Sequence, residues 1–113
     1  MKLTIQQQAF ARDVGKLIAY INDQGYSCTL GDAYRSQHEA QYNAQQGKGI
    51  VKSLHTQRMA IDLNLFSPAG EFLQNTEDHR QFGIFWEKLD PKNRWGGNFK
   101  SRPDGNHYER TLT

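Results

Sequence analysis

The sequence has a single cysteine and no long hydrophobic run, and each of these shortages excludes a class of protein. With Cys28 alone, the chain can form neither an internal disulfide nor a cysteine-based zinc site. Residues 1–8 lack an apolar core of signal-peptide length, and no other segment is apolar enough to cross a membrane. We therefore expect the chain to fold in the cytoplasm, with Cys28 as a buried and unreactive thiol.

A strong excess of charge of either sign is also missing. The formal net charge is +2, which is too small to predict nucleic-acid binding by itself. A slightly basic surface would suit DNA and a bacterial cell wall about equally well. With 113 residues and 36% hydrophobic content, we expect a single domain over residues 1–113 with a modest core.

Hydrophobic periodicity divides the chain into helices and strands. The pattern predicts helices over residues 4–24, 36–46 and 76–89, strands over 26–34 and 59–66, and a final strand–loop–strand unit from 94 to 112. Thr4 and Thr76 are the expected caps of the first and third helices. Short connections between alternating helices and strands predict an α+β domain with a mainly antiparallel sheet packed against helices.

The strand at 59–66 carries an acid within an apolar alternation. Met59, Ile61 and the following odd-numbered residues face one way, and Asp62 faces the other. His55 is an odd number of positions from Asp62, so a continuous strand would place the two on opposite faces. We therefore expect His55 in a turn before the strand, bent back toward Asp62.

These residues can form a mononuclear zinc site. An unpaired carboxylate in an apolar setting loses several kcal/mol of hydration, and a bound cation offsets that cost. His55, Asp62 and His107 fit a site with two histidines, one carboxylate and an open position for water. Asp104, three residues before His107, is a candidate general base, and Arg35 could stabilise an oxyanion or bind a carboxylate.

Each of these residues also has an ordinary alternative. A single histidine in a loop is usually structural or solvated, which is what we expect of His38 and His79. An arginine such as Arg35 is more often a partner in a surface ion pair. Histidine and aspartate are common residues, so their spacing alone leaves the zinc site open.

Three motifs resemble a known family. Residues 53–62 read Ser-x-His-x-x-x-x-Ala-x-Asp, residues 34–36 read Tyr-Arg-Ser with Gln41 following, and residues 95–109 read Trp-Gly-Gly-Asn-Phe-Lys-Ser, then Asp-x-x-His-Tyr-Glu. In this order they resemble the zinc-dependent peptidoglycan peptidases. That family includes D-alanyl-D-alanine carboxypeptidases and dipeptidases and the L-alanyl-D-glutamate endopeptidases of phage endolysins.

The resemblance implies a role for each matching residue: zinc on His55, Asp62 and His107, Asp104 as general base, Arg35 stabilising the polarised carbonyl, and Ser53 contacting the substrate. The dipeptidase branch has glutamate at the position of Asp104. Together with Trp-Gly-Gly at residues 95–97, this favours the L-alanyl-D-glutamate bond of the stem peptide.

The chain departs from the family pattern at three positions between and beside these residues. The family glycine between the two ligands of the first motif is Arg58 here, so we expect a turn that does not depend on a positive φ angle. Asn98 and Phe99 stand where the family has an acid and a tryptophan. These changes concern the shape and charge of the cleft, not the ligands.

We therefore expect a small, monomeric endolysin-type peptidase of phage or prophage. It would stay in the host cytoplasm without a signal peptide and act on the cell wall after release. Its partner would be the peptidoglycan stem peptide, with no nucleic acid and no stable membrane association. The alternatives are a D-alanyl-D-alanine carboxypeptidase and a catalytically silent zinc-binding or wall-binding module. A nucleic-acid-binding protein or nuclease is disfavoured because the chain lacks a strong basic patch.

Overall fold

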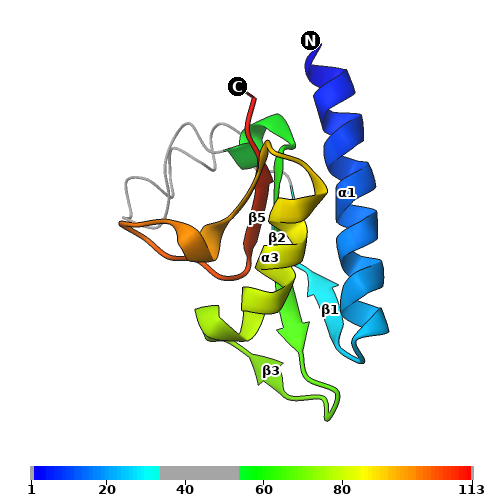
Figure 1. Cartoon of the computed structure of the whole chain (residues 1–113), viewed down its shortest axis with the longest axis vertical. Helices are drawn as coiled ribbons and strands as arrows, with labels where there is room; N and C mark the ends of the chain where they lie inside the picture. Colours follow the sequence, from blue (N-terminus) through cyan, green and yellow to red (C-terminus); the bar gives the residue numbers. More distant parts are fainter. Residues whose placement is uncertain (1, 34–53, 113) are drawn as a thin grey trace.

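A computed structural model describes residues 2–33 and 54–112. Over these ranges the elements are α1 (Leu3–Asp23), β1 (Ser27–Leu30), β2 (Ala60–Phe66), β3 (Phe72–Leu73), α3 (Arg80–Leu89), β4 (Asn93–Trp95) and β5 (His107–Arg110), with 3-10 turns at Leu54–Gln57, Thr76–His79 and Gly96–Asn98. The helix predicted over 36–46 lies outside the described residues. The predicted α+β class is confirmed (Figure 1).

The strands form one five-stranded sheet in the order β1-β2-β5-β4, with β3 added to β2. Each of its strand pairs is antiparallel, as predicted from the order of the elements. The β2–β5 register places Asp62 directly opposite His107. Glu109 lies two positions after His107 on β5, and the β4–β5 register places it opposite Arg94.

Among the described residues, helices α1 and α3 cover one face of this sheet (Figure 1). The odd-numbered residues of β2 are buried in the core, which also contains Phe10 and Leu17 of α1 and Phe82 and Trp86 of α3. Figure 1 shows α3 lying across β2 and β5, with α1 beside it. Because side chains alternate along a strand, Asp62 lies on the opposite face from this core.

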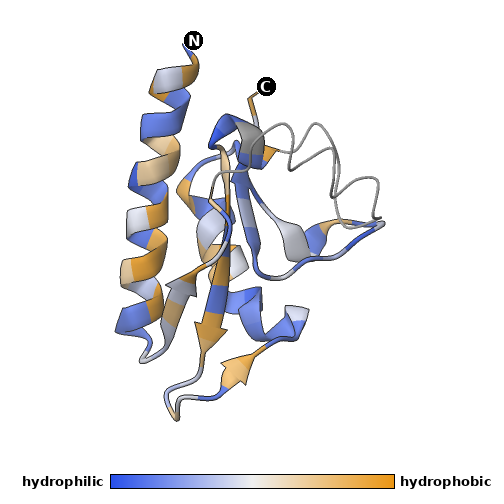
Figure 2. Cartoon of the chain, turned by 180° about the vertical axis from the view of Figure 1, so that it is seen from behind, coloured by the Kyte–Doolittle hydropathy of each residue, from blue (hydrophilic) through white to orange (hydrophobic). Residues whose placement is uncertain are grey.

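Helix α1 packs an apolar stripe that includes Phe10, Leu17 and Ile21 against the core. Hydrophilic and hydrophobic residues alternate along it, as Figure 2 shows. Ile5 is apolar but 48% exposed, whereas the polar Gln6 is buried. Gln6 tolerates burial because its Oε1 accepts a hydrogen bond of 2.8 Å from Nε of Arg110. None of the helices in the two described ranges is long and apolar enough to cross a membrane.

Both predicted N-caps were wrong. Helix α1 begins after Lys2, which has an extended backbone and makes no side-chain cap bond, so Thr4 already lies inside the helix. Thr76 does not cap α3 either: the helix begins after His79, and Asn75 caps the 3-10 turn Thr76–His79 that precedes it. Asn75 forms a reciprocal capping box with Asp78, and the turn then leads into the helix.

The first strand is shorter than predicted and its cysteine less deeply buried. Strand β1 covers Ser27–Leu30, not residues 26–34, and the end of the predicted range lies outside the described residues. Leu30 is 65% exposed, and Cys28 is half-buried rather than fully enclosed. Burial still raises the pKa of the Cys28 thiol, which disfavours the reactive thiolate.

The buried His79 makes the stability of the fold depend on pH. Its side chain is 2% exposed, and Nδ1 lies 2.9 Å from the Tyr108 hydroxyl. Burial lowers the pKa of His79 to about 4, while the charge of Asp78 acts in the opposite direction. The unfolded chain therefore binds more protons than the folded chain between about pH 6.5 and pH 4, and stability falls as the pH falls through this window.

We expect the wild-type chain to lose about 2 kcal/mol more unfolding free energy than His79→Gln between pH 7.5 and pH 4.5. Glutamine can keep a hydrogen bond to Tyr108 but does not titrate in this range. Urea unfolding at several pH values measures the difference. Parallel stability curves for the two proteins would contradict this role of His79.

Candidate metal centre

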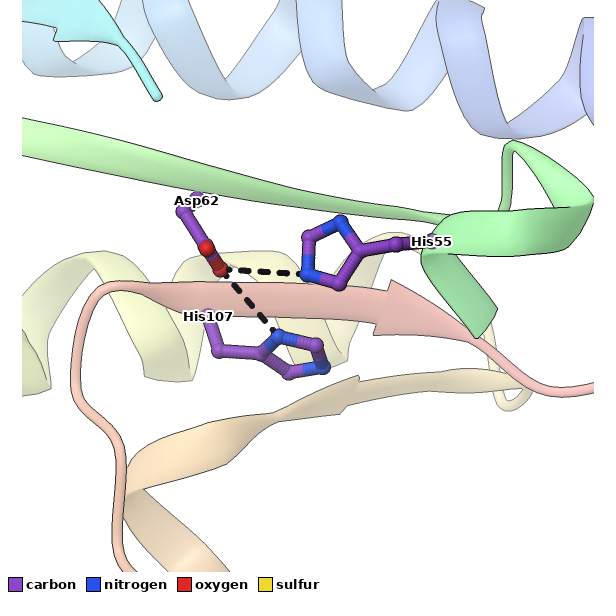
Figure 3. A group of neighbouring side chains, drawn as sticks. All are labelled: His55, Asp62 and His107. Atoms are coloured by element: carbon purple, nitrogen blue, oxygen red, sulfur yellow. Dashed lines mark hydrogen bonds and ion pairs between the residues drawn. The ribbon is translucent and has the colours of Figure 1, made fainter. Parts of the chain in front are cut away.

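Three side chains from separate parts of the chain converge on the sheet face opposite α3. His55 lies on the 3-10 turn Leu54–Gln57, Asp62 on β2, and His107 on β5. Oδ1 of Asp62 is 3.4 Å from His55 Nε2 and 3.3 Å from His107 Nδ1, as Figure 3 shows. One ligand atom from each residue lies within 4.8 Å of the others. The structure thus brings together all three predicted ligands, with His55 off the strand as expected.

The turn that presents His55 depends on an unusual backbone conformation at Arg58. Its φ angle is +55°, in the left-handed region that favours glycine. The N–H of Arg58 donates to the His55 carbonyl, and the N–H of Met59 donates to the Leu54 carbonyl. This pair of bonds is a Schellman motif, which requires the left-handed residue. The expectation of a turn without positive φ was therefore wrong: Arg58 adopts the glycine conformation.

The charges of the cluster depend strongly on one another. Burial opposes ionisation of Asp62, but hydrogen bonds from His107 and His55, together with their charges, hold its pKa at about 2. Burial also opposes protonation of His107, yet its bonds to Asp62 and Glu109 raise its pKa to about 9. An ionised carboxylate thus faces two imidazole nitrogens. This donor set, with its atoms close enough to share one ion, fits a divalent metal such as zinc.

Asp104 is placed beside the cluster by a tight contact with Gly96. The Asp104 N–H donates to the Gly96 carbonyl (2.9 Å), and the His107 N–H donates to the Asp104 carbonyl (3.2 Å). A Cβ atom on Gly96 would lie 2.2 Å from the Asp104 carbonyl oxygen, so only glycine fits. Partial desolvation of its carboxyl raises the pKa of Asp104, although the residue is exposed at the surface, and the charge of Asp62 raises it further. Asp104 therefore lies within electrostatic reach of the three converging residues.

The Trp-Gly-Gly motif has a structural explanation in the packing of Trp95. The ring is fully buried, and its Nε1 donates to the Gly105 carbonyl at 2.7 Å. A Cβ on Gly83 or on Gly97 would lie within 2.2 Å of ring atoms of Trp95, so both glycines allow the chain to pass directly over the ring. The motif thereby fixes the loop that carries Asp104.

The two departures after this motif are accommodated by their surroundings. Asn98 donates from Nδ2 to Oε1 of Glu87 at 3.0 Å, a position where an acid would face another carboxylate. The Phe99 ring lies 5.7 Å from the His107 ring. Neither change removes a group from the cluster of three.

Sequence reasoning gave no role to Glu109, although its carboxylate contacts a predicted ligand directly. Glu109 Oε1 lies 2.7 Å from Nε2 of His107. Burial raises the pKa of Glu109, but its bonds to His107 and Arg94 and their charges lower it below its ordinary value. The signal was present in the sequence: residues two apart on a strand share a face, and Glu109 follows His107 by two.

The remaining predicted site residues lie elsewhere. Arg35 and Ser53 are outside the described residues, as is His38. His79 is buried against Tyr108, in agreement with the structural role expected of it.

A pocket of about 320 Å³ adjoins Asp104. Its lining residues include Asn64, Gln74 and Asn106, which have carboxamide side chains, and the apolar Phe72. Carboxamides can both donate and accept hydrogen bonds, which suits the amide groups of a peptide.

Comparisons with known proteins agree with this geometry. Residues 46–110 match a family model described as D-alanyl-D-alanine carboxypeptidase. A search of curated proteins gave no match. The fold is similar to the L-Ala D-Glu endopeptidase ChiX of Serratia marcescens, with a TM-score of 0.65 and 21% identity over 76% of this chain and 68% of that chain.

The fold is also similar to a mutant of the vancomycin-resistance D,D-pentapeptidase VanY from a VanB-type cassette, solved in complex with Zn(II). The TM-score is 0.64, with 14% identity over 90% of this chain and 70% of that chain. At such identities the two structures show a common fold.

Replacing Arg58 with glycine should stabilise the chain. A non-glycine residue in the left-handed region costs about 1–2 kcal/mol, and the flexibility of glycine in the unfolded chain offsets part of this. We expect Arg58→Gly to raise the unfolding free energy by about 0.5–1 kcal/mol, and Arg58→Ala, which keeps a Cβ atom, to give no such gain. Urea unfolding compares the three proteins, and a destabilised Arg58→Gly would show that the side chain contributes more than its backbone costs.

Proposed function

Because the chain belongs to the D-alanyl-D-alanine carboxypeptidase family, whose model covers residues 46–110, we propose that it is a zinc-dependent endopeptidase of peptidoglycan stem peptides. Membership of the family makes it a peptidoglycan peptidase. The observation that carries the zinc site is the convergence of His55, Asp62 and His107 within 4.8 Å. The fold shared with a zinc-bound peptidase supports it.

In this proposal His55, Asp62 and His107 hold the metal as two neutral imidazoles and one carboxylate. Zinc in such a site lowers the pKa of water and polarises a carbonyl group. His55 and His107 are 3% and 12% exposed, so the imidazoles are held in place by their surroundings. The 20% exposure of Asp62 leaves this face of the cluster accessible to a substrate.

Asp104 is the general base of the proposed reaction. Its carboxylate would accept a proton from the attacking water and deliver it to the leaving amine nitrogen as the amide C–N bond breaks. The raised pKa of Asp104 favours both transfers, because a base works best when its pKa approaches the working pH. Arg35 and Ser53 keep their predicted roles toward the carbonyl and the substrate.

For the substrate we propose the L-alanyl-D-glutamate bond. The proposal rests on the resemblance of Trp95-Gly96-Gly97 and Asp104 to the endolysin branch, and the fold shared with ChiX agrees with it. In this proposal the pocket beside Asp104, whose lining residues include Asn64, Gln74 and Asn106, would take the peptide on one side of the scissile bond. The biological setting would be phage-induced lysis, with the enzyme held in the host cytoplasm until release. A D-alanyl-D-alanine carboxypeptidase is the second candidate, favoured by the description of the matching family.

Variants of the four central residues separate metal binding from catalysis. We expect His55→Ala, Asp62→Ala and His107→Ala each to lose both zinc and activity, since each removes a ligand. Asp104→Ala should keep zinc and lose turnover by a factor of about 10²–10⁴, the usual contribution of a general base. Zinc content after dialysis and the rate on purified muropeptides measure the two effects. Cleavage by Asp104→Ala at the wild-type rate would show that another group is the base.

The products of muropeptide digestion show which peptide bond the enzyme cleaves. Mass spectrometry of digested muropeptides should show cleavage between L-alanine and D-glutamate, leaving the terminal D-alanine in place. Loss of terminal alanine alone would contradict the endopeptidase and establish the carboxypeptidase. Zinc binding with intact muropeptides would support a catalytically silent module instead.

A further inference from the structure

We propose that Glu109 is a positioning residue that holds His107 with its Nε2 protonated and its Nδ1 aimed at the metal. This inference rests on the proposed zinc site and adds to it a residue that contacts one of the ligands without binding the metal itself. Nδ1 of His107 faces Oδ1 of Asp62 at 3.3 Å, and Nε2 faces Oε1 of Glu109 at 2.7 Å. The two nitrogens of one ring thus point to two different carboxylates.

The two oxygens of Glu109 have separate partners. Oε1 contacts the His107 ring, and Oε2 accepts bonds from the Arg94 guanidinium, at 2.9 Å from Nε and 2.5 Å from Nη2. The Glu109 side chain is 7% exposed, so such a carboxylate would be costly without partners. The ion pair with the exposed Arg94 therefore occupies Oε2 and leaves Oε1 to contact His107.

The backbone at Glu109 is held by strand pairing with Arg94 and by the side chain of Trp86, which belongs to the core. Arg94 and Glu109 are direct partners in the β4–β5 ladder. Nε1 of the buried Trp86 lies 3.2 Å from the Arg94 carbonyl and 3.0 Å from the Glu109 carbonyl, so one indole N–H bridges both strands. The Phe99 ring packs near the His107 ring at 5.7 Å. The ring of His107 is thus constrained by contacts on several sides.

The chemistry of the pair follows from the tautomers of imidazole. A neutral ring carries one proton, and the nitrogen that binds a metal must be the one without it. A carboxylate 2.7 Å from Nε2 keeps the proton there and leaves the Nδ1 lone pair for the metal. A partner of this kind also orients the ring and makes it a stronger ligand, and its loss typically weakens metal binding 10–100-fold.

The test measures zinc affinity by chelator competition in the full chain. We expect Glu109→Ala to bind zinc about 10–100-fold more weakly than wild type. Glu109→Gln should lose less, because the amide oxygen can still accept a hydrogen bond from Nε2.

Arg94→Ala is the matched control, since it breaks the same ion pair but leaves the carboxylate beside His107. The Arg94 side chain is 55% exposed, and an ion pair of this kind contributes little, so zinc affinity should change less than about threefold.

A second readout reports the tautomer directly. In ¹⁵N-labelled, zinc-loaded protein, long-range ¹H–¹⁵N correlations should show the His107 proton on Nε2. Because Glu109→Gln keeps an acceptor, this pattern should persist in that variant and be lost or weakened in Glu109→Ala.

The outcomes distinguish failure of the proposed zinc site from failure of the role proposed for Glu109. A wild-type chain that binds no zinc would overturn the metal site and this inference together. Wild-type zinc affinity in Glu109→Ala would overturn the inference alone, as would an equal loss in Arg94→Ala, which would assign the effect to strand packing. A proton on Nδ1 of zinc-loaded His107 would also overturn it, because zinc would then be bound through Nε2.

Discussion

The antiparallel pairing of β2 with β5 is the constraint on which the site depends. It places Asp62 opposite His107 on the face of the sheet away from α1 and α3. A shift of one residue in this register would turn one of the two side chains into the core, because side chains alternate along a strand. His55 joins them from the turn that enters β2. The core packing of Ile61 and Tyr108, which are also paired in this ladder, therefore secures the cluster.

The groups around the cluster are fixed by the same strand. Strand β5 follows the turn that carries Asp104, and the close approach of Gly96 to that turn sets where the carboxylate lies. Two residues after His107, Glu109 reaches the far side of the imidazole ring. The candidate base, the third ligand and the residue proposed to position it thus lie within one short segment. The placement of residues 104–109 thus determines the positions of three of the proposed functional groups.

Local features of this fold could be predicted from the sequence, and non-local ones could not. The alternation in β2 and the displacement of His55 from it follow from the period of a strand. The Asp62–His107 register depends on contacts between distant segments: residue types made His107 a candidate ligand, and the family resemblance favoured it over the alternatives. The turn at Arg58 was predicted wrongly because its hydrogen bonds, and not the residue type, impose the positive φ. Glu109 was overlooked because its role depends on which nitrogen of His107 faces the cluster.

The central claim is that one metal ion is held by residues from the turn, β2 and β5. Diffraction at the zinc absorption edge from crystals of the zinc-loaded protein tests it most directly. The account predicts a single anomalous peak bonded to Nε2 of His55, Oδ1 of Asp62 and Nδ1 of His107. A peak held by other residues, or none between these three atoms at saturating zinc, would contradict it.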